Sequence, residues 1–148
     1  MALKEFLIHS QKHSQAVKML NYMPLFQELL SIMKQKELFF MEVMWMKCRP
    51  AYRKAIEWCR SGRIGSIRYI KADFSNFVPY DAENRLFRAD CGGDVLLDLS
   101  VYPLTLIQDV LGMPESIISN AHIQNGINLS NTILLRYDNG IFASSEYL

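Results

Sequence analysis

The amino-acid sequence predicts an α+β or mixed α/β domain in which helices cover one face of a sheet. Segments with helical and strand-like patterns alternate over the first two thirds of the chain, and strand patterns dominate the last third. The chain has 148 residues, of which 50% are apolar and 21% are charged. This length and composition suit one globular domain with a hydrophobic core of its own.

Helix and strand patterns alternate in the first part of the chain. Apolar residues recur at helical spacing over residues 22–36, where a first helix is predicted. The continuous apolar run over residues 37–44 favours a short buried strand. A second, amphipathic helix is predicted over residues 51–59, because Pro50 suits a helix start and Ser61-Gly62 suits a helix end.

The middle of the chain is predicted to hold a strand, a long connection and a helix. Partial alternation over residues 67–77 predicts a strand. Residues 78–93 form a polar connection whose length is typical of a functional loop or a lid. A helix over residues 94–111 follows, since Gly112 and Pro114 give a clear stop signal.

The last third is predicted to be strands, over residues 116–123, 131–137 and 141–147. Asp138-Asn139-Gly140 lies between the last two segments and predicts a tight hairpin. The sequence stops inside the final strand pattern. Because an unpaired strand exposes backbone hydrogen-bonding groups, we expect either a covering chain or an incomplete protein.

Composition argues against several classes of protein. The net charge of +1 gives no electrostatic footprint for nucleic acid. The apolar runs are too short to span a bilayer, and the N-terminus does not have the pattern of a signal peptide. The three cysteines and three histidines do not fall at metal-ligand spacing. We therefore expect a cytoplasmic protein with reduced thiols, without a metal site and without a nucleic-acid or membrane partner.

Two polar residues stand out in the apolar helix predicted over residues 94–111. Asp98 and Tyr102 are four positions apart, which on a helix places both on one face. They are candidates for a proton-handling pair, and the alternative is a satisfied structural hydrogen bond. For Asp98 that alternative is a bond to the connection 78–93, because a carboxylate in an apolar helix is costly without a partner.

Several motifs follow one another along the chain, namely Phe39–Trp45, Arg49–Tyr52, Gly62–Gly65, Asn84–Phe87, Cys91–Gly93 and Leu97–Leu104. In this order they resemble the Gfo/Idh/MocA family of NAD(P)-dependent oxidoreductases, and especially its dihydrodiol dehydrogenase-like branch. The resemblance begins near residue 34 and covers roughly three quarters of the chain.

The resemblance implies that residues 38–148 are part of the family's C-terminal substrate-binding and dimerisation domain, which has an open, predominantly antiparallel sheet. Residues 1–37 would then be the helical remnant of the end of the nucleotide-binding domain. The Gly-x-Gly-x-x-Gly turn that opens the family's Rossmann domain is absent from the chain. The sequence thus resembles an internal piece of an oxidoreductase without a complete Rossmann domain.

The resemblance also implies roles for individual residues. The tyrosine matching Tyr102 is the family's general acid/base, and a free phenol, with a pKa of about 10, needs a nearby cation to work near neutrality. Lys18 is a candidate for the family lysine that supplies this cation, although its two neighbours differ from the family motif. The alternative for Lys18 is a solvated helix lysine. Arg49 and Arg85 are candidate substrate contacts, or else solvated loop arginines.

The function implied is hydride transfer between NAD or NADP and a sugar, polyol or dihydrodiol-type alcohol, by a homodimer formed through the sheet. Because the chain has no nucleotide-binding turn, we do not expect it to bind the cofactor alone. The alternative is a catalytically inactive dimerisation module, or a decayed gene product that keeps only the sheet domain.

Overall fold

The computed structural model describes residues 24, 27–39 and 44–147, which belong to two compact units, 1–44 and 45–148. In the first unit, residues 27–35 are helical, in agreement with the helix predicted there. The described residues of the strand predicted over 37–44 form a turn and irregular chain, and Phe39 is 87% exposed. The described part of this unit offers no strand with which they could pair.

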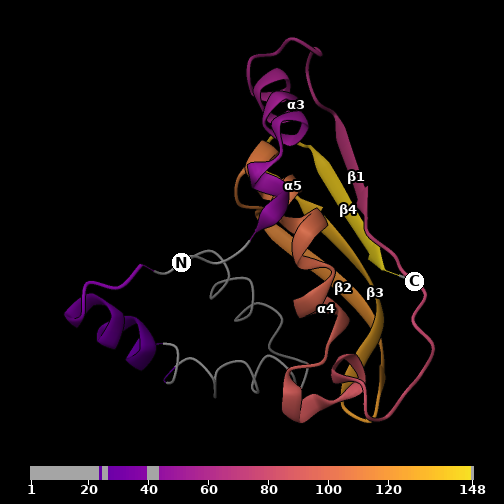
Figure 1. Ribbon diagram of the computed structural model, residues 1–148. Helices are drawn as coiled ribbons and strands as arrows, with labels where there is room; N and C mark the ends of the chain where they lie inside the picture. The colour runs from indigo at the N-terminus through magenta and orange to yellow at the C-terminus, as the bar shows by residue number, and fades with distance from the viewer. Residues whose placement is uncertain (1–23, 25–26, 40–43, 148) are drawn as a thin grey trace. The chain divides into compact units, whose positions relative to one another are not determined.

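The second unit contains all the strands that the structure describes, and Figure 1 shows their arrangement. The helical segments are η1 (Trp45–Cys48), α3 (Pro50–Arg60), η2 (Arg85–Phe87), η3 (Ala89–Cys91), α4 (Val95–Asp98) and α5 (Val101–Leu111). The strands are β1 (Tyr69–Asp73), β2 (Ser116–Gln124), β3 (Ile127–Arg136) and β4 (Phe142–Tyr147). No helix in the described ranges is long and apolar enough to cross a membrane.

The four strands form one open sheet in the order β1-β4-β3-β2. Strands β2, β3 and β4 pair antiparallel, whereas β1 pairs with β4 in parallel. Figure 1 shows α4 and α5 on the same side of this sheet. The predicted fold class, an open and mostly antiparallel sheet with helices on one face, is therefore confirmed.

Both hairpins of the sheet depend on residues with positive φ. The predicted hairpin after β3 forms, with the Tyr137 amide donating to the Ile141 carbonyl at 3.0 Å and Gly140 at φ +77°. The β2–β3 hairpin turns on Asn125 and Gly126, at φ +52° and +77°, as in a type I′ turn. We had not predicted this turn, and β3 accordingly begins at Ile127, earlier than expected.

The two faces of the sheet differ in what covers them. Side chains such as Ile133, which is 1% exposed, point from β3 toward the helices and form the core. Successive residues of a strand point to opposite faces, and strand partners share a face. The other face therefore carries four half-exposed or exposed apolar side chains, Tyr69, Ile118, Leu134 and Phe142, which we call the open face.

The single helix predicted over residues 94–111 is wrong, because the structure has two helices there, α4 and α5. They are separated at Leu99 and Ser100. The Ser100 side chain is buried and its hydroxyl accepts a hydrogen bond from the Asn131 amide of β3 at 3.0 Å. This contact attaches the break between the two helices to the sheet.

The remaining helix prediction is confirmed with small shifts in its bounds. Helix α3 has Pro50 in its first turn, buries Ile56 and ends at Ser61, with Gly62 at φ +72° just beyond. Strand β1 spans only the centre of the segment 67–77 in which it was predicted.

We predict that the two faces of β3 respond differently to truncation. Ile133→Ala leaves a cavity in the core and is expected to lower the free energy of unfolding by about 2–5 kcal/mol. Leu134→Ala, on the adjacent residue of the open face, serves as the control and should change it by about 0.5 kcal/mol or less. Urea unfolding followed by circular dichroism measures both. Equal losses in the two variants would contradict the assignment of the faces.

Candidate functional site

Tyr102 lies in the first turn of α5, between two aromatic rings from distant parts of the chain. The Trp45 ring of η1 is 5.9 Å away and the Phe74 ring, directly after β1, is 5.4 Å away, measured between ring centroids. Both rings are tilted against the phenol, at 51° and 57°, a favourable arrangement for aromatic pairs. Three segments therefore meet at Tyr102.

Trp45 and Phe74 were not among the predicted site residues. Trp45 closes one of the motifs that carry the family resemblance, and this signal could have identified it. The residues around Phe74 give no such signal, because nothing local shows that the end of β1 lies beside α5.

The Arg49 side chain lies over the Trp45 ring. Its guanidinium carbon lies 5.7 Å from the centroid of the Trp45 ring, within the range of a cation–π contact. Among the described residues Arg49 has no ion-pair partner. Its role as a substrate contact stays a prediction.

Asp98 is bound to Arg85 and lies on a different helix from Tyr102. It is the last residue of α4, and the break at Ser100 separates it from α5. The Arg85 guanidinium donates to both oxygens of its carboxylate at 3.1–3.3 Å. No hydrogen bond joins Asp98 to the Tyr102 hydroxyl in the described part of the chain. Asp98 and Tyr102 therefore do not lie on one face of a single helix, which corrects that expectation. Asp98 instead binds the connection 78–93 through Arg85, as the alternative prediction states.

The connection 78–93 folds tightly before α4. Asn84 caps η2 by accepting a hydrogen bond from the Leu86 amide at 3.0 Å. A side chain at Gly93 would collide with backbone carbonyls of residues 85–88, which shows why glycine stands there. The close backbone approach expected of the glycine pair is thus present at Gly93 alone, which also donates to the Arg88 carbonyl at 2.9 Å, whereas Gly92 has open space around it and a positive φ of +72°.

Lys18 lies outside the described residues, so its relation to Tyr102 stays a prediction. Within the described ranges no three His, Cys, Asp or Glu side chains are grouped closely enough to hold a metal ion. The same ranges contain no Gly-x-Gly-x-x-Gly turn, and cofactor binding by this chain stays a prediction.

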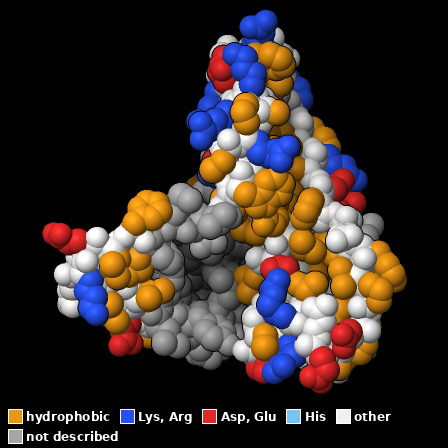
Figure 2. All heavy atoms as spheres, viewed as in Figure 1, with side chains coloured by type: hydrophobic (Ala, Val, Ile, Leu, Met, Phe, Trp, Pro, Cys, Tyr) orange, Lys and Arg blue, Asp and Glu red, His pale blue; other side chains and the backbone are white. Residues whose placement is uncertain are grey.

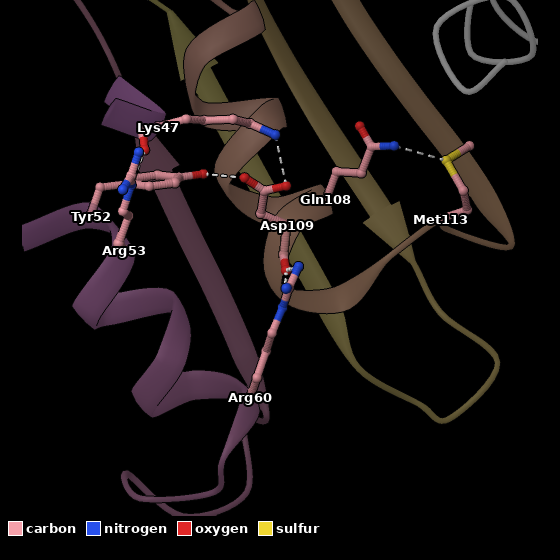
Figure 3. A network of polar contacts seen from close by, with 7 residues as sticks. All are labelled: Lys47, Tyr52, Arg53, Arg60, Gln108, Asp109 and Met113. Carbon is pink, nitrogen blue, oxygen red and sulfur yellow. Dashed lines mark hydrogen bonds and ion pairs between the residues drawn. The ribbon is translucent and has the colours of Figure 1, made fainter. Parts of the chain in front are cut away.

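A second polar cluster joins η1 and α3 to the end of α5 (Figure 3). The Asp109 carboxylate accepts hydrogen bonds from the Tyr52 hydroxyl at 2.7 Å and from the Lys47 ammonium at 2.9 Å. The Arg60 guanidinium donates to the Asp109 backbone carbonyl. Figure 2 shows further Lys and Arg side chains gathered over α3. We had not predicted this cluster, since Asp109 gives no sequence signal.

The cluster shifts the pKa values of its members in opposite directions. Burial raises the pKa of the Asp109 carboxyl, but hydrogen bonds from Tyr52 and Lys47 and the nearby positive charges outweigh it, so the pKa falls below its usual value. Burial, and then the hydrogen bond to Asp109, raise the pKa of the Tyr52 phenol. Asp109 is therefore ionised and Tyr52 is a neutral donor at neutral pH. The cluster borders an open cavity of about 340 Å³ that does not reach Tyr102.

Comparison with known families gives a match over most of the second unit. Residues 52–147 match the family model described as the GFO/IDH/MocA C-terminal domain. The chain is 30% identical over 122 residues to trans-1,2-dihydrobenzene-1,2-diol dehydrogenase of Bos taurus. It is 31% identical over 111 residues to dTDP-3,4-didehydro-2,6-dideoxy-alpha-D-glucose 3-reductase of Streptomyces violaceoruber. These matches cover 80% and 72% of this chain, but 36% and 32% of the relatives.

A solved structure shows the same fold. KijD10, a 3-ketoreductase from Actinomadura kijaniata in complex with NADP and TDP-benzene, superposes with a TM-score of 0.69 and 25% sequence identity. The match covers 84% of this chain and 38% of that one. The chain thus spans about a third of the length of the relatives it matches.

We predict that the Arg85–Asp98 pair holds the connection 78–93 against α4. Arg85→Gln removes the charge that binds Asp98 and should speed amide hydrogen exchange over residues 85–91, because the connection then opens more often. Arg88→Gln is the matched control, since Arg88 pairs with Asp90 inside the same connection. If the two variants exchange at the same rate, the pair does not have this role.

Proposed function

Because this chain belongs to the GFO/IDH/MocA family of oxidoreductases, we propose that it forms the substrate-facing part of an NAD(P)-dependent oxidoreductase site, with Tyr102 as general acid/base. The observation that carries this proposal is the placement of Tyr102 between Trp45 and Phe74. An isolated surface tyrosine would not be held in this way by two other segments.

The chemistry assigned to Tyr102 is proton transfer at its hydroxyl oxygen. In reduction, the hydroxyl donates a proton to the carbonyl oxygen of the substrate, and in oxidation the phenolate accepts the proton of the alcohol. A bound nicotinamide supplies or accepts the hydride. The Trp45 and Phe74 rings keep the phenol oriented, because each packs against it. Lys18 remains the proposed cation that favours the phenolate.

The surroundings of Tyr102 suit a cyclic substrate with hydroxyl or keto groups. Trp45 and Phe74 are both partly exposed, so each ring offers apolar surface to the C–H groups of a sugar, a polyol or a dihydrodiol. Arg49 supplies donors for hydroxyl oxygens at the edge of this surface. The names of the bovine and Streptomyces relatives, a ring diol and a deoxy sugar, support this class.

Asp98 and Arg85 have a different role in this proposal from Tyr102. Because each neutralises the other, neither is free to bind substrate while the pair is intact. We therefore assign them to holding the connection beside the site. The three cysteines are free thiols, two of them exposed, and this favours a reducing compartment such as the cytoplasm.

A second candidate function is dimerisation, with or without catalysis, and the open face favours it. Tyr69, Ile118, Leu134 and Phe142 come from all four strands and lie on one side of the sheet. Exposed apolar groups of this kind mark protein–protein contacts in soluble proteins. A second copy of the chain that packs on this face would bury them and form a homodimer.

We expect Tyr102→Phe to lower NAD(P)-dependent turnover of a dihydrodiol or sugar substrate by about 10²–10⁴-fold, because the proton can no longer be transferred. Tyr69→Phe removes a hydroxyl from the open face and is the matched control, with activity unchanged. Nicotinamide absorbance measures the rates. Full activity of Tyr102→Phe would refute the acid/base role. Because the chain alone is not expected to bind the cofactor, these rates are measured with a nucleotide-binding domain of the family supplied, and tight NADP binding by the unaltered chain alone would contradict that expectation. If the enzyme completed in this way does not turn over, the inactive dimerisation module is supported instead.

We expect Ile118→Glu to dissociate the homodimer, because it buries a charge in the apolar contact. Ile64→Glu adds the same charge at an exposed isoleucine outside the sheet and should leave the dimer intact. Light scattering after gel filtration gives the mass of each variant. A monomer at all concentrations of the unaltered chain would rule out the dimer.

A further inference from the structure

We propose that Asp109 is a positioning residue, which fixes η1 on α5 and so sets Trp45 against Tyr102. The inference rests on the proposed function, because it assigns the cluster in Figure 3 to the Tyr102 site. The contact of Asp109 with Lys47 and Tyr52 is itself independent of catalysis and can be tested without an activity assay.

Helix α5 holds the η1–α3 segment at two points. Tyr102 contacts Trp45, and Asp109 contacts Lys47 and Tyr52. Tyr102 and Asp109 are seven residues apart, so they lie on one side of the helix and about 10 Å apart along its axis. Two contacts at this separation fix the direction of the segment as well as its position.

Polar contacts hold η1 in its position. None of the four residues of η1 is buried, and Trp45 is 46% exposed. Apolar burial therefore contributes little to the position of this segment. Lys47 instead donates to Asp109, and its backbone carbonyl accepts a hydrogen bond from the Arg53 guanidinium at 2.9 Å. η1 is thus tied both to α5 and to α3.

The two contacts of Asp109 require a carboxylate at this position of α5. One Asp109 oxygen accepts from Lys47 and the other from Tyr52, on either side of the start of α3. In an asparagine only one of these two positions is an oxygen and the charge is lost, so one of the two donors would face an NH2 group instead of an acceptor. The depressed pKa of Asp109 keeps the carboxylate ionised at neutral pH.

The test places Asp109→Asn in a Trp58→Phe background, where Trp45 is the only tryptophan. We expect a red shift of Trp45 emission, stronger quenching by acrylamide and loss of near-ultraviolet circular dichroism from the Trp45–Tyr102 pair. The far-ultraviolet spectrum should stay unchanged, since the sheet does not depend on Asp109. Unchanged Trp45 signals in the folded variant would overturn the proposal.

Matched variants separate positioning from general effects of charge. Glu57→Gln makes the same carboxylate-to-amide change on α3, where Glu57 forms its one ion pair among the described residues with Lys54, and should leave Trp45 unaffected. Should Asp109→Asn fail to fold, Tyr52→Phe removes one donor and keeps the ring, and an intermediate shift of Trp45 emission is expected. If Glu57→Gln acts like Asp109→Asn, or Tyr52→Phe has no effect, the proposal is wrong.

Acid titration gives a second readout. A carboxyl whose folded pKa is depressed stabilises its contacts above its unfolded pKa of about 3.9 and loses this contribution as the pH falls through the folded value. Trp45 emission should therefore shift in acid below the usual carboxyl range, and Asp109→Asn should abolish this step. Persistence of the step in Asp109→Asn would assign it to another group.

Steady-state kinetics distinguish this proposal from the proposed function. Asp109→Asn should raise KM for the substrate more than it lowers kcat, because it displaces a wall of the site and leaves the phenol in place. If Tyr102→Phe retains activity, the proposed function fails while the Trp45 response still tests the positioning role. If Tyr102→Phe is inactive and Asp109→Asn leaves Trp45 unchanged, only the positioning role fails.

Discussion

The buried hydrogen bond between Asn131 and Ser100 attaches the start of α5, and with it the candidate site, to the sheet. Both side chains are nearly inaccessible, so each would be costly to bury without the other. Because Ser100 directly precedes α5, its attachment to β3 fixes the start of that helix on the sheet. The first turn then places Tyr102 beside Trp45 and Phe74. The same break ends α4 at Asp98, whose carboxylate is left to meet the connection before it.

The site combines a rigid part and a more weakly held part. The sheet and α5 are held by the core, in which Ile107 and Ile133 are almost fully buried. The segments that carry Trp45 and Arg85 lie at the surface and are held by the partly exposed ion pairs Lys47–Asp109 and Arg85–Asp98. Such pairs contribute little stability, typically about 1 kcal/mol or less. The side chains around Tyr102 can therefore rearrange without unfolding the domain.

What the sequence predicts correctly here is encoded locally. Helix α3 and the hairpin at Gly140 follow from proline, glycine and periodicity, and the family follows from the order of the motifs along the chain. The break at Ser100 could not be predicted locally, because the apolar pattern runs through it without interruption and Asn131, which binds Ser100, lies 31 residues away. The Asn125-Gly126 turn differs, because the Asn-Gly pair is itself a local signal for a hairpin. The roles of Phe74 and Asp109 could not be inferred, because no local pattern indicates which segments pack together.

The parallel pairing of β1 with β4 has a consequence for how the protein is made. The two strands are more than 70 residues apart in sequence, and β4 lies between β1 and β3. During synthesis β2 and β3 can form their hairpin as soon as both have left the ribosome, but β1 has no partner until residues 142–147 emerge. The charges of Lys71 and Asp73 on β1 would discourage association with other nascent chains during that wait. Since Phe74 follows β1 directly, the aromatic site is complete only after β4 has emerged and paired with β1.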